Sequence, residues 1–368
     1  MGKKRILIVD DAVVVRRMLS DMLAQDEDLE VVATASNGKI ALDKIPQVNP
    51  DIIILDLDMP EMGGLETLQH IRKIDRHLPV IVFSTRTERG AKVTLEALSM
   101  GATDYVTKPS TLSGGMSAID AIRGQLVPKV KGLRKRRRAP AQLEKPSVKE
   151  IPKTSLRKPV PKVTPAHVPL PPPTRRSRIR LLAIGSSTGG PTALTELLTA
   201  IPAPLPVPVL IVQHMPPIFT RILAERLSVN TRHKAFECTS GTVIEPGKIW
   251  IAPGNFHMVV TKAPSGPRMQ THQGEPENSC RPAVDVLLRS VADVYGSSAL
   301  TVILTGMGSD GLKGCRRIRE VGGQVLAQDE ESSVVWGMPG YVAKEGLAEK
   351  VLPIGALAAE ICSRIGRG

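Results

Sequence analysis

The chain lacks the features of an exported or membrane-spanning protein. No stretch approaches the roughly 18 uninterrupted apolar residues that a transmembrane helix needs. The first eleven residues carry two lysines and an arginine ahead of only four apolar residues, Ile6 to Val9, and two aspartates follow. A signal peptide has a longer apolar region. We therefore expect a soluble, cytoplasmic protein without a transmembrane segment.

Cysteine is scarce as well. The four cysteines, Cys238, Cys280, Cys315 and Cys362, are widely separated, with no CxxC pair and no histidine at the spacing of a metal site. We expect reduced thiols and no zinc.

Acidic residues are nearly absent from residues 123–180, which hold 18 Lys or Arg against two Glu. This segment has a net charge of +16 and the whole chain +13, so the remainder carries −3. The segment also holds 11 of the 31 prolines, which predicts an extended, disordered linker at 123–178. The positive charge is therefore not the signature of a folded nucleic-acid reader. The linker is either a solvated spacer or makes non-specific contacts with an acidic membrane surface, receptor or nucleic acid.

On either side of this linker, strand-like runs alternate with helical stretches, which is typical of parallel sheets. Residues 1–122 and 179–368 are thus two domains of ordinary size, both expected to be doubly wound, mainly parallel α/β folds. The predicted strands lie at 5–9, 31–35, 51–55, 80–83 and 104–106, and then at 180–184, 209–212, 249–251, 301–304 and 324–327.

Polar side chains follow the predicted strands of the first domain. In an open α/β sheet, ligands bind beyond the carboxyl ends of the strands. Asp10 and Asp11 follow the first strand, Asp56 the third, Ser84 the fourth and Lys108 the fifth. Any one of the aspartates alone would more often be a helix cap, but together they predict a Mg²⁺ site where a carboxylate accepts a phosphoryl group.

In the second domain, a strand leads into a glycine-rich turn that contains Ser187, followed by a helix. His214 follows the next strand and Asp310 a later one, so all three are expected at one edge of the sheet as nucleophile, base and orienting acid. The alternatives are a phosphate-binding turn, a histidine without function and an aspartate in a simple turn. The residues alone leave these open.

The first domain resembles a response-regulator receiver domain, which is flavodoxin-like. The motifs DD, LDLDMPEMGG, FST and DYVTKP appear in that order. The resemblance implies that Asp56 is the phosphoacceptor, that Asp10, Asp11, Asp56 and the carbonyl of Asp58 bind Mg²⁺, that Ser84 and Tyr105 are the switch pair, and that Lys108 contacts the phosphoryl group.

The second domain resembles the catalytic domain of the CheB methylesterases, with the motifs IGSSTGGPTAL, VQHMPPIFT, IAPGNFHM, RPAVDVLLRSVA, LTGMGSDG and VVWGMPG. This resemblance implies a Rossmann-like domain that needs no cofactor. The domain would hydrolyse glutamate methyl esters on chemoreceptors and deamidate glutamines. Ser187, His214 and Asp310 would be the triad. Backbone N–H groups near Thr188 and Met307 are candidates for the oxyanion hole, and His257 and the Thr188 hydroxyl for lining the site.

The same resemblance implies that the unphosphorylated receiver covers the active site until a chemotaxis-type histidine kinase phosphorylates Asp56. The long linker favours weaker inhibition than a short tether would give. The rival functions are a phosphorylation-dependent scaffold with an inactive hydrolase-like domain, a DNA-binding regulator using the basic run at 134–138, and an NAD-dependent enzyme. No specific nucleic-acid partner is expected, because no folded reader follows the linker, and the third glycine of a dinucleotide motif is missing.

Overall fold

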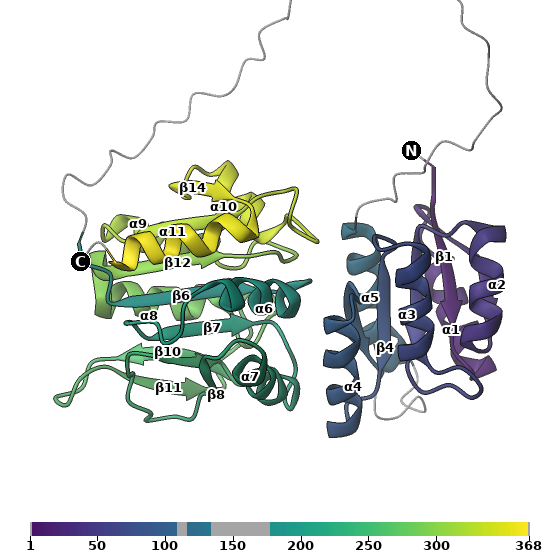
Figure 1. The fold of residues 1–368 in the computed structure, drawn as a ribbon, viewed down its shortest axis with the longest axis horizontal. Coiled ribbons are helices and arrows are strands. Elements are labelled where there is room, and N and C mark those ends of the chain that lie inside the picture. The colour runs from purple at the N-terminus through teal and green to yellow at the C-terminus, as the bar shows by residue number, and fades with distance from the viewer. Residues whose placement is uncertain (1, 109–115, 134–176, 367–368) are drawn as a thin grey trace, which may run out of the picture.

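The computed structural model describes residues 2–108, 116–133 and 177–366 (Figure 1). Within these ranges the chain forms two domains, each built on a parallel sheet, as expected. Most of the predicted linker, residues 134–176, lies outside the described residues. None of the helices in the described ranges is long and apolar enough to cross a membrane.

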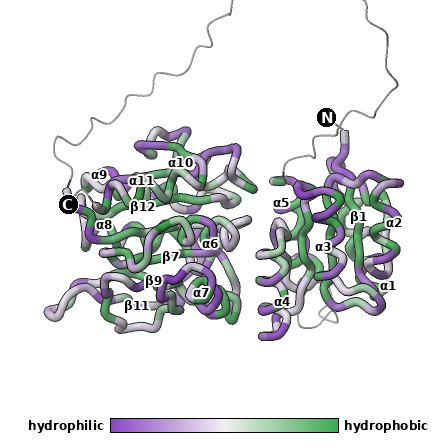
Figure 2. The backbone as a smooth tube through the Cα atoms, viewed as in Figure 1, coloured by the Kyte–Doolittle hydropathy of each residue, from purple (hydrophilic) through white to green (hydrophobic). Residues whose placement is uncertain are grey.

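The first domain has a five-stranded sheet in the order β2-β1-β3-β4-β5, with every pairing parallel. Its strands are continuous apolar runs because helices cover both faces; all five residues of β3 are buried. Figure 2 shows these strands as the hydrophobic centre of the domain. The elements are β1 (Lys4–Val9), α1 (Val13–Leu23), β2 (Leu29–Ala35), α2 (Gly38–Val48), β3 (Ile52–Asp56), α3 (Gly64–Ile74), β4 (Val80–Ser84), α4 (Glu88–Ser99), β5 (Asp104–Thr107) and α5 (Met116–Gly132).

Helix α5 continues past residue 122, where the linker was expected to begin. Ile122, Leu126 and Val130 lie on one face at a spacing of four residues, and each is almost fully buried in the core of the first domain. The charged residues of this stretch obscured that spacing in the sequence. The helix therefore takes up ten residues that composition alone assigned to the linker.

The second domain has a seven-stranded parallel sheet in the order β14-β13-β12-β6-β7-β9-β8 and a separate antiparallel pair, β10-β11. Strands β7, β8 and β9 are added on one side of β6, and β12, β13 and β14 on the other side. The strand order therefore reverses between β6 and β12. The elements are β6 (Leu181–Ser186), α6 (Gly190–Ala200), β7 (Val209–Gln213), α7 (Phe219–Asn230), β8 (Lys234–Glu237), β9 (Lys248–Ile251), β10 (His257–Thr261), β11 (Arg268–His272), α8 (Val284–Tyr295), β12 (Ala299–Ile303), α9 (Leu312–Glu320), β13 (Gln324–Gln328), α10 (Met338–Lys344), β14 (Lys350–Leu352) and α11 (Ile354–Gly366).

The two domains touch through a surface that we call the domain interface. The ring of Tyr105, at β5, stacks on Phe219, the first residue of α7, with centroids 4.9 Å apart and planes 5° from parallel. Beside it, Arg221 of α7 forms an ion pair of 3.3 Å with Glu88 of α4. Apolar side chains of both domains join one continuous buried cluster here. The receiver-like domain therefore packs on the helix that follows the predicted catalytic histidine.

Candidate functional site

The first candidate site lies at the carboxyl edge of the five-stranded sheet, where the strand order reverses between β1 and β3. Oxygens of Asp10, Asp11 and Asp56 lie within 4.8 Å of one another. The Lys108 ammonium is 2.7 Å from Asp56 Oδ2 and 3.1 Å from Asp10 Oδ2. The structure thus brings together the three predicted carboxylates and the predicted lysine. Asp58 lies exposed just beyond them.

Burial raises the pKa of Asp56 to about 6, and the Asp10 charge adds to this shift, while Lys108 opposes it. Asp56 Oδ1 accepts the backbone N–H of Leu57 at 2.8 Å, and Oδ2 faces the other carboxylates and Lys108. Clustered carboxylates repel one another, and a hard divalent cation with oxygen ligands removes that repulsion. This donor set fits a divalent ion of the Mg²⁺ type.

The predicted switch residues lie on the route from this pocket to the domain interface. Ser84 Oγ is buried at the end of β4, where it accepts from Thr94 Oγ1 at 2.5 Å and donates to the carbonyl of Gly90 in α4 at 3.2 Å. Tyr105 is 7% exposed and stacks on Phe219. Ser84 therefore touches the same helix, α4, that contacts the second domain.

The second candidate site begins at the turn between β6 and α6, which carries Ser187. Gly189 has a φ of +76°, which an L side chain rarely adopts. A Cβ on Gly190 would lie 1.9 Å from Gln213 Oε1, so only glycine lets the turn approach β7 this closely. The Ser187 N–H donates to the carbonyl of Thr305 at 3.0 Å. The turn is therefore fixed on both sides.

Gln213, the last residue of β7, ties the serine turn to the histidine. Its Oε1 accepts from Ser186 Oγ at 2.7 Å and its Nε2 donates to the carbonyl of Ser187 at 2.9 Å. The backbone N–H of His214 donates to the carbonyl of Ser186 at 3.1 Å. Ser187 and His214 thus leave neighbouring strands in a fixed relation.

His214 and Asp310 form a direct pair, because His214 Nε2 lies 2.7 Å from Asp310 Oδ2. An ionised carboxylate only accepts, so Nε2 carries the proton and Nδ1 is the basic nitrogen. Burial lowers the pKa of His214, but the hydrogen bonds with Asp310 and Cys280 outweigh this effect and raise the pKa. Nδ1 lies 3.5 Å from Cys280 Sγ, and among the described residues no hydrogen bond joins it to Ser187.

Five donors hold the carboxylate of Asp310. Besides His214, they include the first N–H groups of α8, at 2.6 Å from Val284 to Oδ2 and 3.0 Å from Asp285 to Oδ1. Oδ1 also accepts from the N–H of Gly311 at 3.0 Å and from Asn278 Nδ2 at 2.9 Å. Burial raises the pKa of Asp310, but the hydrogen bonds and the charge of His214 lower it by a larger amount. The pKa of Asp310 is therefore below its ordinary value. Asp310 is therefore an ionised, immobile acceptor.

The backbone N–H groups of Thr188 and Met307, the two oxyanion candidates, have no acceptor within the described ranges. Thr188 follows the serine and is buried, and Met307 lies in the loop after β12. Unpaired N–H groups beside a nucleophile suit an oxyanion hole. The side chain of Met307 points to the first domain, where its Cε would touch a Cβ placed on Gly132.

His257 is 1% exposed at the start of β10, and both of its ring nitrogens are used. Nε2 donates to the carbonyl of Glu275 at 3.0 Å and Nδ1 accepts from the N–H of Ala283 at 3.2 Å. Burial lowers its pKa, in keeping with a neutral ring. The structure thus gives His257 a part in holding the segment 275–283 in place.

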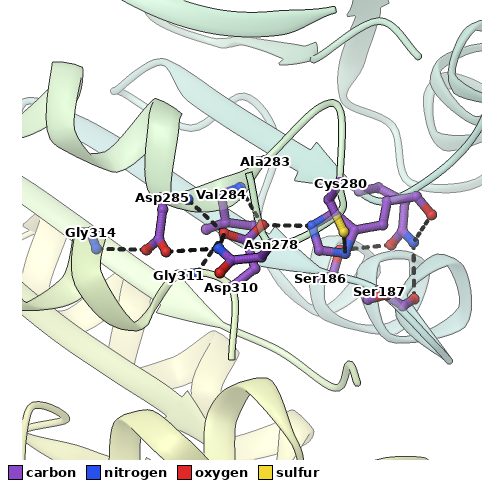
Figure 3. Close-up of polar contacts among 12 residues, drawn as sticks. Ser186, Ser187, Asn278, Cys280, Ala283, Val284, Asp285, Asp310, Gly311 and Gly314 are labelled. Atoms are coloured by element: carbon purple, nitrogen blue, oxygen red, sulfur yellow. Dashed lines mark hydrogen bonds and ion pairs between the residues drawn. The ribbon is translucent and has the colours of Figure 1, made fainter. Parts of the chain in front are cut away.

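Sequence reasoning did not single out Gln213, Asn278, Cys280 or Asp285. Gln213 and Asp285 lie inside two of the recognised motifs, VQHMPPIFT and RPAVDVLLRSVA, which was the only available signal. Asn278 bridges Asp285 Oδ2 at 3.0 Å and Asp310 Oδ1 (Figure 3). Cys280 contacts His214. These two contacts depend on a loop that folds back over the end of β12.

Comparison with known proteins follows the same division. Residues 182–361 match the family model described as CheB methylesterase, and residues 6–120 match the response regulator receiver domain. The chain is 51% identical over 368 residues to a protein-glutamate methylesterase/protein-glutamine glutaminase of Trichodesmium erythraeum, which covers all of both chains. A protein of the same name from Nocardioides sp. is 47% identical over 363 residues, covering 99% of this chain and 96% of the relative.

Among solved structures, the crystal structure of the Thermotoga maritima CheB methylesterase catalytic domain matches with a TM-score of 0.50 and 39% identity. It covers 51% of this chain and 99% of that domain, so the match accounts for the seven-stranded domain as a whole.

Proposed function

The chain belongs to the CheB methylesterase family, and we propose that Ser187, His214 and Asp310 are its catalytic triad. The protein is a protein-glutamate methylesterase and protein-glutamine glutaminase with a receiver domain, acting in chemotactic adaptation. The observation that carries the assignment of the triad is the 2.7 Å bond between His214 Nε2 and a fully clamped Asp310, beside the turn that presents Ser187.

In the proposed reaction, Ser187 Oγ attacks the ester carbonyl of a methylated glutamate while His214 Nδ1 takes the hydroxyl proton. His214 then returns this proton to the departing methanol, and a water molecule repeats the sequence to free the enzyme. Asp310 keeps the proton on Nε2 and stabilises the imidazolium. The proton therefore moves only between Ser187, Nδ1, the leaving group and water.

The N–H groups of Thr188 and Met307 would receive the negative charge that develops on the carbonyl oxygen. Such donors are already oriented before the substrate arrives and cost no reorganisation during the reaction. Losing one oxyanion donor typically costs about 3–4 kcal/mol of barrier stabilisation.

In the receiver domain, Asp56 would accept the phosphoryl group from a chemotaxis-type histidine kinase. Asp10, Asp11, Asp56 and the carbonyl of Asp58 would hold Mg²⁺, which neutralises charge on the phosphoryl oxygens. Lys108 is already within 2.7 Å of Asp56 and would contact the same oxygens.

Control would act through the domain interface. The Tyr105–Phe219 stack lies at the start of α7, the helix that follows His214. The end of α5 contacts Met307, which lies near Ser187. A docked receiver would therefore keep a methylated receptor helix away from Ser187. Phosphorylation of Asp56 would shift Ser84, and with it helix α4, toward the phosphoryl group. This shift would weaken the contact between α4 and α7.

The test is methanol release from a methylated chemoreceptor signalling fragment by the full chain. We expect Ser187→Ala to abolish release, and Ser297→Ala, at a half-buried serine outside the site, to leave it unchanged. A phosphodonor with Mg²⁺ should stimulate the wild type but not Asp56→Asn. No release by the phosphorylated wild type on several receptor fragments would instead support the scaffold function.

A further inference from the structure

We propose that Cys280 and His214 form a thiol–imidazole pair at which a low-molecular-weight disulfide reversibly switches off the esterase. The inference rests on the proposed role of His214 as the base. Cys280 Sγ lies 3.5 Å from His214 Nδ1, and Nδ1 is the nitrogen that Asp310 leaves available. The thiol thus lies beside the nitrogen that would act as the base for Ser187.

The other cysteines have surroundings that suppress reactivity. Burial raises the pKa of Cys238 to about 12, and it raises the pKa of Cys315 and of Cys362 as well. Reactive cysteines have a nearby cation or base that favours the thiolate, which is the nucleophilic form. Of the four thiols, all within the described residues, Cys280 is the one in contact with an imidazole.

The location of Cys280 also allows a reagent to reach it. Cys280 is half-buried, whereas residues 272–276 and Ser279 around it are exposed. Its backbone N–H and carbonyl form a two-way pair with Glu277, and Glu277 is tied to Arg289 of α8 by an ion pair of 2.6 Å. The thiol is thus held against the histidine in a half-buried residue whose neighbours along the chain are exposed.

The reaction is thiol–disulfide exchange and needs no other oxidant. The Cys280 proton moves to His214 Nδ1, and the resulting thiolate attacks one sulfur of the disulfide. A new S–S bond forms at Cys280 as the old one breaks, and the departing thiolate takes the proton from Nδ1. The chain sulfur is oxidised, the small disulfide is reduced, and a thiol reductant reverses the exchange.

The adduct inhibits because of where it lies. Sγ is within 3.5 Å of Nδ1, so a group attached to Sγ fills the space through which the Ser187 proton must pass. The bond between His214 and Asp310 remains on the other side of the ring. Inhibition should therefore lower the rate of the chemical step without unfolding the domain.

The experiment treats the full chain with 2-hydroxyethyl disulfide and follows two independent readouts. Peptide mass spectrometry measures the rate at which each cysteine gains the adduct, and methanol release from a methylated receptor fragment measures activity relative to the untreated sample of the same variant. We expect Cys280 to react about tenfold faster than Cys362, because His214 Nδ1 lies 3.5 Å from its sulfur and can accept the thiol proton as the sulfur attacks. Activity should fall in step with the Cys280 adduct and return with a reductant.

Four variants separate the possible causes. Cys280→Ala and Cys280→Ser should keep their own untreated activity after treatment, while Cys362→Ala should be inhibited like the wild type. His214→Gln should slow the modification of Cys280 to the rate of Cys362, a result that does not depend on esterase activity. Equal reaction of Cys280 and Cys362, or a Cys280 adduct that leaves the wild type active, would overturn the proposal. An untreated wild type that releases no methanol would overturn the proposed function instead.

Discussion

Asn278 is the side chain whose removal should most clearly show that the clamp on Asp310 matters for catalysis. Its amide nitrogen lies 2.9 Å from Asp310 Oδ1 and 3.0 Å from Asp285 Oδ2. Its φ is +52°, so Asn278→Gly removes the amide without forcing an alanine into left-handed backbone.

The expected magnitude follows from these contacts. A hydrogen bond to a charged group contributes about 1.5–3 kcal/mol, and Asn278 makes two of them. If the transition state loses half the free energy of one such bond, about 0.75–1.5 kcal/mol, kcat/KM falls about four- to thirteenfold. With one donor fewer, Asp310 attracts the His214 proton more strongly, so the pKa of His214 should rise further.

The assay is a pH profile of methanol release. The base works only when His214 is neutral, so activity is lost as the pH falls through the pKa of His214, which already lies above its ordinary value of 6.5. We expect the ascending limb of Asn278→Gly to move to higher pH. Asn230→Gly, at an exposed asparagine at the end of α7, is the control. An unchanged kcat/KM and an unmoved limb would refute the reasoning.

Three further changes test other parts of the structure. Asp310→Asn removes the charge that raises the pKa of His214, so the limb should move to lower pH while kcat falls by a factor of about 10³–10⁴, as seen by kinetics across pH. Tyr105→Ala removes the ring stack at the domain interface, a contact worth about 0.5–1.5 kcal/mol, and should raise the activity of the unphosphorylated chain severalfold. Gly190→Ala places a Cβ 1.9 Å from Gln213 Oε1 and should destabilise the domain by about 1–3 kcal/mol in urea unfolding.

Each of these has a matched control. Asp293→Asn alters a surface ion pair, Tyr341→Ala truncates an exposed tyrosine, and Gly355→Ala adds a Cβ where nothing lies within 4 Å. A pH limb of Asp310→Asn that moves upward, a Tyr105→Ala chain no more active than Tyr341→Ala, or a Gly190→Ala domain as stable as Gly355→Ala would each contradict the corresponding prediction.

The sequence predicted the two parallel sheets because their strands are apolar runs that end in polar residues. Asp10, Asp56 and His214 each come directly after a strand or at its last residue, so the direction of the sheet was enough to bring them to the right edge. Asp310 could be placed in the same way from the loop after β12. Periodicity and strand ends thus carried most of the prediction.

Other contacts could not be predicted because they depend on how loops fold in three dimensions. Asn278 and Cys280 reach Asp310 and His214 only because the segment after β11 turns back over the sheet, with positive φ at Asn278 and Ser279. The end of α5 was assigned to the linker because its basic residues obscured the buried positions of Leu126 and Val130. In neither place does spacing along the chain reveal the partner.

The domain interface has a consequence for the order of events during signalling. The docked receiver uses α4, β5 and the end of α5, whereas Asp11 and Asp58 at the acidic pocket remain exposed to solvent. If Asp56 is the phosphoacceptor as proposed, a phosphodonor would reach it while the two domains are still docked. Under the proposed function, the chain would not have to open before it is phosphorylated.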